Sequence, residues 1–293
     1  ENYKHSKFFN KKSMSLTHRI IQKLLSSPKF LGRDFLIVNL PKCFIRKPKE
    51  TEIVQTNFGF KIKVNPIFDK NIENLIYQRG VYELGTVSVL QDFLTAGDVF
   101  VDVGANIGFL SLVGAKAVGK TGKVYCFEPV PSTYTILEEN KRINNFQQME
   151  LHQFALGNKT EKVQIYAEDE NRGGASIVNH VSEKGIKIEV KKLEKINLSD
   201  KINVIKIDVE GLELDVLKGA EKILRKDQPK LIIEYSVDRN NSGEENELYH
   251  WLNNLGLYRI YKLKNGKERK SKLVEILSIA DLPLHDNIFC KKK

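Results

Sequence analysis

An acid and two glycines separate two apolar runs in the stretch VFVDVGANIGFLSL, residues 99–112. Asp102 comes one residue before the end of the first run, and Gly104 and Gly108 bracket the turn that follows. Such a turn between a strand and a helix lets backbone N–H groups approach a ligand closely. The dinucleotide fingerprint G-x-G-x-x-G is not met, because Asn106 stands where its second glycine would be. The turn therefore predicts a nucleotide-type ligand other than a dinucleotide.

A second acid indicates which ligand this is. Asp102 would repel a phosphate, whereas S-adenosylmethionine (SAM) carries an ammonium and a sulfonium group. The next apolar run ends at Glu128, whose carboxylate can accept hydrogen bonds from a ribose diol. The two acids together favour SAM over NAD. The alternative of a glycine-rich turn with a stray acid stays open.

Two further carboxylates follow a later apolar run, in IKIDVEGLELDVLKGA. Asp208 and Glu210 are two residues apart, so on an extended strand end their side chains point the same way. Open α/β sheets bind ligands at the carboxyl ends of their strands, so these acids are candidate catalytic groups. The alternative is that one of them only places a negative charge at the start of the following helix.

No metal site is predicted, because the sequence has neither an HExxH motif nor paired cysteines. A carboxylate-bound magnesium at Asp208, Glu210 and Glu234 has no support in the sequence. The three cysteines are far apart and odd in number, which favours a reducing compartment over a disulfide framework. No apolar run approaches the ~20 residues of a membrane-spanning helix. We therefore expect a cytoplasmic protein.

Strand and helix patterns alternate after residue 97, which predicts an α/β fold with a doubly wound, mostly parallel sheet. The expected strands are 99–103, 123–128, 149–156, 202–209, 230–235, 258–263 and 287–291. The expected helices between them are 109–118, 132–145, 213–226 and 244–256.

The chain divides into three predicted parts. Residues 1–50 form a basic arm with twelve Lys or Arg against three acids, or +9 of the total net charge of +10. Residues 51–96 form a hairpin and helices that cap the core, and residues 97–293 form the main domain. Within that domain, the polar stretch 157–200 is a lid-like insertion.

The basic arm contains an amphipathic pattern at 16–25 that either packs on the protein or lies on an anionic membrane. Residues 51–293 carry a net charge of only +1, so we do not expect a nucleic-acid partner. The one basic run near the C-terminus, RIYKLKNGKERKSK, is interpreted as a solvated hairpin.

Three motifs in this order resemble the FkbM family of SAM-dependent methyltransferases: the segment ending in DVGANIG, the segment VYCFEP, and VIKIDVEGLELDVLKGA. The resemblance covers about residues 55–291. It implies a Rossmann-like class I methyltransferase fold, with a seven-stranded sheet whose last strand is antiparallel. It also implies O-methylation of a hydroxyl group on a sugar, a lipooligosaccharide or a polyketide-type natural product.

The resemblance also assigns residues, with SAM as the methyl donor and S-adenosylhomocysteine as the product. The methionine moiety contacts the DVGANIG turn, Glu128 binds the ribose, and the end of the third strand lies near the adenine. The cofactor-binding residues are then Glu83, Asp102, Gly104, Asn106, Gly108, Glu128, Ala155 and Leu156. The residues facing the acceptor are Lys206, Asp208, Glu210 and Glu234, with Asp208 and Glu210 as the catalytic pair.

We therefore expect a SAM-dependent O-methyltransferase that acts on a hydroxyl-bearing small molecule or glycan. Two alternatives remain, a nucleic-acid methyltransferase and a SAM-binding module without catalytic activity. The arm of residues 1–50 is expected to allow peripheral contact with an anionic membrane.

Overall fold

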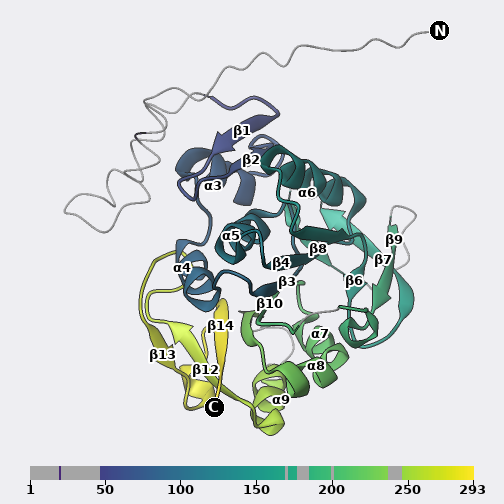
Figure 1. The fold of residues 1–293 in the computed structure, drawn as a ribbon, viewed down its shortest axis with the longest axis vertical. Coiled ribbons are helices and arrows are strands. Elements are labelled where there is room, and N and C mark those ends of the chain that lie inside the picture. The colour runs from purple at the N-terminus through teal and green to yellow at the C-terminus, as the bar shows by residue number, and fades with distance from the viewer. Residues whose placement is uncertain (1–19, 21–46, 169–170, 177–184, 199–200, 237–245) are drawn as a thin grey trace.

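The computed structural model describes residues 20, 47–168, 171–176, 185–198, 201–236 and 246–293. Its centre is an eight-stranded sheet (Figure 1). In spatial order the strands are β13 (Leu273–Glu275), β12 (Tyr258–Leu263), β14 (His285–Lys292), β11 (Lys230–Ser236), β10 (Val204–Ile207), β3 (Val99–Val103), β4 (Lys123–Phe127) and β5 (Met149–His152).

The strand directions are those of the expected fold. Strands β11, β10, β3, β4 and β5 are parallel, and β14 runs antiparallel between β11 and β12. All seven expected strands are present, and the antiparallel last strand is confirmed. Strand β13 is an eighth, short edge strand that directly follows the run interpreted as a solvated hairpin and pairs with β12.

Two element boundaries in the sequence analysis were wrong. The third strand, expected to reach residue 156, ends at His152, and Phe154 instead packs on Phe127 with ring centroids 5.5 Å apart. The helix expected at 213–226 is divided at Ala220 into α7 (Glu213–Gly219) and α8 (Glu221–Asp227).

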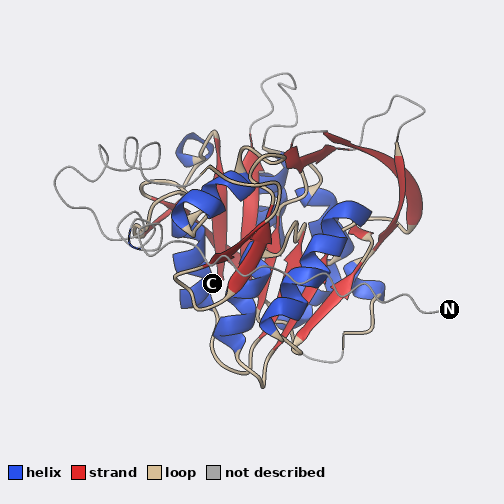
Figure 2. Ribbon diagram, turned by 90° about the horizontal axis from the view of Figure 1, so that it is seen from above, coloured by secondary structure: helices blue, strands red, loops and turns tan. Residues whose placement is uncertain are grey.

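Helices cover both faces of the sheet (Figure 2). The helices α4 (Leu84–Phe93), α5 (Phe109–Val118) and α6 (Pro131–Asn144) share one core with the Phe100 side of β3. The helices α7, α8 and α9 (Glu247–Leu255) share a second core with Val101, on the opposite side of the same strand. Strands buried on both faces explain the continuous apolar runs in the sequence.

The segment before the main sheet contains the hairpin β1 (Glu52–Gln55) and β2 (Lys61–Val64), followed by α3 (Ile72–Arg79). Its β2 edge is tied to α6, because the N–H of Lys63 donates to Asn140 Oδ1 (2.6 Å). The predicted helix at 16–25 lies, apart from Ile20, outside the described residues. Among the described residues, no helix is long and apolar enough to cross a membrane.

A second, four-stranded sheet follows β5. In spatial order it contains β6 (Ala155–Leu156), β9 (Ile186–Lys191), β7 (Glu161–Glu168) and β8 (Asn171–Ser176). Ala155 and Leu156 belong here, paired with β9, and not to the third strand of the main sheet. The apolar side chains of Ile165 and Ile188 pack on Val130, in the segment between β4 and α6. The insertion is therefore attached beside the carboxyl end of β4.

Candidate active site

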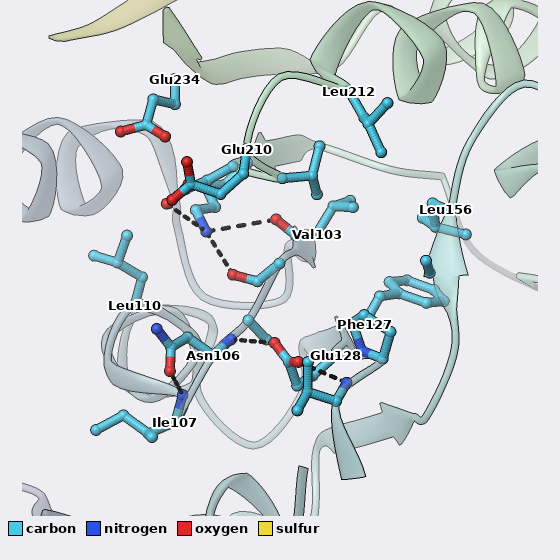
Figure 3. Close-up of a pocket in the computed structure, with 18 of the residues that line it drawn as sticks. Val103, Asn106, Ile107, Leu110, Phe127, Glu128, Leu156, Glu210, Leu212 and Glu234 are labelled. Atoms are coloured by element: carbon cyan, nitrogen blue, oxygen red, sulfur yellow. Dashed lines mark hydrogen bonds and ion pairs between the residues drawn. The ribbon is translucent and has the colours of Figure 1, made fainter. Parts of the chain in front are cut away.

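A pocket lies at the carboxyl ends of β3, β4, β10 and β11, where an open α/β sheet binds ligands (Figure 3). In the close-up, Asn106 and Glu128 lie toward one end of the pocket and Glu210 and Glu234 toward the other. We call these the Glu128 end and the Glu234 end.

The glycine turn lies between the two ends. The N–H groups of Gly104 and Ala105 both donate to the carbonyl of Phe127 (3.0 Å each), which ties the turn to β4. Gly104 has a φ of +73°, and a Cβ there would lie 1.8 Å from the carbonyl oxygen of Asp208. The turn therefore approaches β10 too closely for any side chain at position 104.

The other two predicted residues of the turn have different surroundings. Asn106 lines the pocket at a φ of +50°, and its Oδ1 accepts the N–H of Ile107 at 2.7 Å. Asparagine is among the few non-glycine residues that adopt this backbone conformation readily. Gly108 does not line the pocket. A Cβ at Gly108 would lie 2.5 Å from Leu137 of α6, so this glycine permits helix packing.

Glu128 is fixed by the backbone. Its Oε2 accepts the N–H of Asn106 and its Oε1 accepts the N–H of Val130, both at 2.9 Å. Burial raises the pKa of Glu128 to about 7, although these two hydrogen bonds oppose the rise. Each carboxylate oxygen has a second lone pair, so Glu128 can accept both hydroxyl groups of a ribose diol.

Apolar side chains surround the pocket next to Glu128. Val130, Ala155 and Leu156 come from positions near the end of β4 and from β6, and Ile165 and Ile188 from the inserted sheet. A slot of this kind fits the flat face of a nucleoside base. The last two residues were not predicted, because nothing in their local sequence distinguishes them from ordinary strand residues.

Asp102 lies behind the glycine turn, fully buried, and does not line the pocket. Its Oδ2 accepts a hydrogen bond from Ser111 Oγ (2.5 Å), and its Oδ1 is 3.4 Å from Lys206 Nζ. Burial raises the pKa of Asp102, while the Lys206 ammonium and the Ser111 hydroxyl oppose that rise. A direct contact between Asp102 and a cofactor stays a prediction.

Lys206 joins the turn to the Glu234 end. Its Nζ donates to the carbonyl of Gly104 (2.8 Å) and is 3.3 Å from Asp208 Oδ2. It lies opposite Asp102 in the β10–β3 register and two residues before Asp208, and its ammonium contacts both acids. Burial lowers the pKa of Lys206, but the carboxylates of Asp208 and Asp102 outweigh it and hold the pKa above its ordinary value.

Three acids line the Glu234 end: Asp208, Glu210 and Glu234. Burial alone would raise the pKa of Asp208, yet the Lys206 ammonium holds it below its ordinary value. Burial and then the charge of Asp208 raise the pKa of Glu234 to about 8. Glu210 is exposed, with a φ of +50°. The two predicted catalytic acids therefore lie at one end of the pocket together with Lys206 and Glu234, the other two residues predicted to face the acceptor.

Lys267 is a residue of this end that sequence reasoning missed. Its Nζ is 2.8 Å from Glu234 Oε1 and 3.1 Å from Glu83 Oε1, and its side chain is only 14% exposed. The interpretation of its run as a solvated hairpin is wrong for Lys267. Glu83, predicted to bind the cofactor, is buried beside Lys267 and does not line the pocket, whereas its neighbour Tyr82 does.

A metal centre was not expected from the sequence. Across the described ranges, no group of three or more His, Cys, Asp or Glu side chains could hold a metal ion.

Comparison with known proteins assigns the family. A model of the methyltransferase FkbM domain matches residues 102–263, more than half of the 293 residues. Methyltransferase 1 of Beauveria bassiana (strain ARSEF 2860) is 26% identical over 194 residues, which cover 58% of this chain and 76% of that protein. Methyltransferase sdnD of Sordaria araneosa is 28% identical over 163 residues, which cover 44% of this chain and 62% of that protein.

Among solved structures, the methyltransferase FkbM of Methylobacillus flagellatus KT matches 74% of this chain with a TM-score of 0.44 and 18% identity. The matched region spans only 52% of that protein, about half of its length.

Proposed function

The chain belongs to the methyltransferase FkbM domain family and is a SAM-dependent methyltransferase, and from this premise we propose that its acceptor is a hydroxyl group on a sugar, glycan or related natural product. The finding that carries the proposal is the set of carboxyl groups that line the pocket opposite Glu128. Carboxylates accept hydrogen bonds from hydroxyl groups and can take up their protons.

The Glu128 end suits the nucleoside of SAM. In this proposal Glu128 accepts the ribose hydroxyls, and the adenine lies in the apolar slot that includes Ala155 and Leu156. The methionine moiety lies along the glycine turn at Gly104 and Asn106. When bound, SAM supplies a methyl group on a positively charged sulfur, which is open to attack by an oxygen nucleophile.

At the Glu234 end, Asp208 is proposed to orient the acceptor. Its lowered pKa keeps it ionised at neutral pH, so it can accept a hydrogen bond from the attacking hydroxyl. Glu210 lies on the exposed side of the same turn and is proposed to contact the acceptor at the pocket mouth. Holding the oxygen in line with the methyl group is the main catalytic contribution, and such positioning is worth about 7–11 kcal/mol.

The same acids argue against a nucleic-acid acceptor. Asp208, Glu210 and Glu234 line the part of the pocket that an acceptor enters, and a phosphate backbone there would meet like charges. A binding module without catalysis would not require two lysines to hold acidic groups at the pocket.

Methyl transfer from isotopically labelled SAM tests the proposal. The acceptor panel contains glycans, hydroxylated natural products and a bulk tRNA fraction, and the products are analysed by mass spectrometry. We expect a methyl ether on a hydroxyl group. Label in the tRNA would instead support the nucleic-acid alternative, and SAM binding without transfer would support the binding module.

Substitution of Asp208 is the matched test of the site. Asp208→Asn is expected to lower turnover at least tenfold while the SAM affinity changes little, because Asp208 lies at the Glu234 end. Asp215→Asn, on α7, is the control and is expected to retain turnover. Equal turnover of Asp208→Asn and the unaltered protein would remove Asp208 from the mechanism.

The arm of residues 1–50 is proposed to bring the protein to an anionic membrane surface, on the basis of its +9 net charge. Co-sedimentation with vesicles that contain an anionic lipid, with and without these residues, tests this. Membrane contact predicts that only the longer chain sediments.

A further inference from the structure

Glu234 is surrounded by charged and titratable groups from four parts of the chain. Lys267, in the segment after β12, is 2.8 Å away, and His285 of β14 lies 3.7 Å from the same carboxylate oxygen. Asp208, just after the end of β10, lines the same end of the pocket, and its negative charge raises the pKa of Glu234. The negative charge of Glu234 also contributes to a raised pKa of Tyr82, which lies before α4. The Glu234 carboxyl group thus contacts an ammonium and lies at the same end of the pocket as a second carboxylate.

The carboxyl groups of Asp208 and Glu234 compete for one proton. Repulsion between two neighbouring negative charges disfavours the ionisation of both. Asp208 also contacts the Lys206 ammonium, which favours its charged form. The proton of the pair therefore resides on Glu234.

Lys267 is fixed on both sides. Its backbone N–H donates to Asp286 Oδ1 (2.9 Å), and its carbonyl accepts the N–H of Gly85 (2.8 Å). Its second partner, Glu83, accepts a hydrogen bond from Asn287 Nδ2 (2.9 Å). The ammonium is therefore held at Glu234 by contacts that do not involve the pocket.

The buried cluster around Lys206 and Lys267 contains more carboxyl groups than ammonium groups. Four carboxyl groups, those of Glu83, Asp102, Asp208 and Glu234, contact two ammonium groups, those of Lys206 and Lys267. Uptake of one proton by the Asp208–Glu234 pair reduces the excess of negative charge, which makes this pair the place where the cluster accepts a proton most readily.

We propose that Asp208 and Glu234 act as one proton-accepting unit for the acceptor hydroxyl, and that Lys267 is the positioning residue that holds this unit. The inference rests on the proposed function and deepens it. The hydroxyl oxygen forms a bond to the methyl carbon, the carbon–sulfur bond breaks, and its electron pair stays on sulfur. The hydroxyl proton passes to the ionised pair, so charge and atoms balance.

The proton-accepting pair of Asp208 and Glu234 makes kcat depend on pH. The pair is a far stronger base when both carboxyls are ionised than when it already holds one proton. The pKa of Glu234 of about 8 marks the change between these states, so kcat is expected to rise with pH up to about 8 and then level off. If ionised Asp208 alone accepted the proton, kcat would be flat across this range.

Substitution of Lys267 shifts that profile in a defined direction. The ammonium lowers the pKa of Glu234, so Lys267→Met raises it. We therefore expect kcat to fall about tenfold at pH 7, and the loss to narrow toward pH 9, where more of the pair is ionised in both proteins. Lys267→Arg keeps the charge and restores the profile. Lys264→Met, an exposed lysine of the same segment, is the control and leaves it unchanged.

An infrared titration tests the pair without any acceptor. In the chain of residues 1–293 with S-adenosylhomocysteine, a protonated carboxyl band is expected to disappear with a midpoint near pH 8. The band should be absent in Glu234→Gln, retained in Glu128→Gln, and shifted to higher pH in Lys267→Met. Absence of such a band in the unaltered protein, or its persistence in Glu234→Gln, would overturn the inference.

The two proposals fail in different ways. Protein that shows the band but methylates no hydroxyl overturns the proposed function and with it the role of the pair in transfer. Protein that methylates a hydroxyl with a kcat independent of pH between 6 and 9 leaves the proposed function intact and overturns the proton-accepting unit.

Discussion

The two ends of the pocket are built in different ways. At the Glu128 end, backbone groups within about 30 residues of one another define the site: two N–H groups hold Glu128, and two others tie the glycine turn to β4. At the Glu234 end, side chains from distant segments hold one another by charge, as in the contacts of Lys267 with Glu83 and Glu234. The comparison teaches that one end depends on local geometry and the other on buried charge balance.

The largest expected effect follows from breaking the link between the two ends. Lys206→Met removes the ammonium that contacts both Asp102 and Asp208 and leaves a fully buried acid without its cation. Removing one partner of a buried ion pair costs about 3–5 kcal/mol. Urea denaturation should show this loss of stability.

Lys222→Met provides the control. Lys222 lies 3.9 Å from Glu194 with a side chain that is 79% exposed, so its loss should change stability by less than about 1 kcal/mol. Equal effects of the two substitutions would show that buried charge balance does not hold the site together.

The geometry of the glycine turn predicts the next effect. Gly104→Ala places a Cβ within 1.8 Å of the Asp208 carbonyl at a positive φ, so the turn must move. We expect a loss of about 3 kcal/mol or more in stability, together with at least a tenfold weaker SAM affinity measured by calorimetry.

Gly256→Ala is the control that separates the effect of the steric clash at position 104 from the effect of a positive φ alone. Gly256 has a similar φ of +76° but nothing within 4 Å of the added Cβ. Its substitution should cost only about 1–2 kcal/mol and leave SAM affinity unchanged. If both variants bind SAM alike, the close approach of the turn to β10 has no role in cofactor binding.

The smallest effect concerns the pH dependence of the Glu128 end. Burial raises the pKa of Glu128 to about 7, so below that pH the carboxyl is protonated and must lose its proton to accept two ribose hydroxyls. The dissociation constant of SAM should therefore rise about tenfold per pH unit below pH 7. Calorimetry from pH 5.5 to 8 measures this, and Glu128→Gln should abolish the dependence.

The difference between the Glu128 end and the Glu234 end also explains which features could be predicted from the sequence. The strands, the glycine turn and Glu128 follow from local patterns, and the resemblance to the FkbM family is confirmed by the matched domain. Asp208 was predicted because it follows an apolar strand at the carboxyl edge of the sheet, so its spacing along the chain is enough. Glu234, inside β11, was assigned only by the resemblance to the FkbM family.

The missed residues depend on contacts between distant segments. Lys267 lies in a basic, polar run, and its partners Glu83, 184 residues earlier, and Glu234 are distant in the sequence. Ile165 and Ile188 belong to a sheet whose pairing with residues 155–156 follows from the early end of β5. Asp102, which was predicted to bind the cofactor, lies opposite Lys206 in the strand register and is fully buried, and its direct contact with the cofactor stays a prediction.

A crystal structure with S-adenosylhomocysteine tests the assignment of the two ends most directly. We expect both ribose hydroxyls within hydrogen-bond distance of the Glu128 carboxylate, with the sulfur directed toward Asp208 and Glu234. A ligand with its ribose at the Glu234 end, or its sulfur turned away from Asp208, would contradict the account.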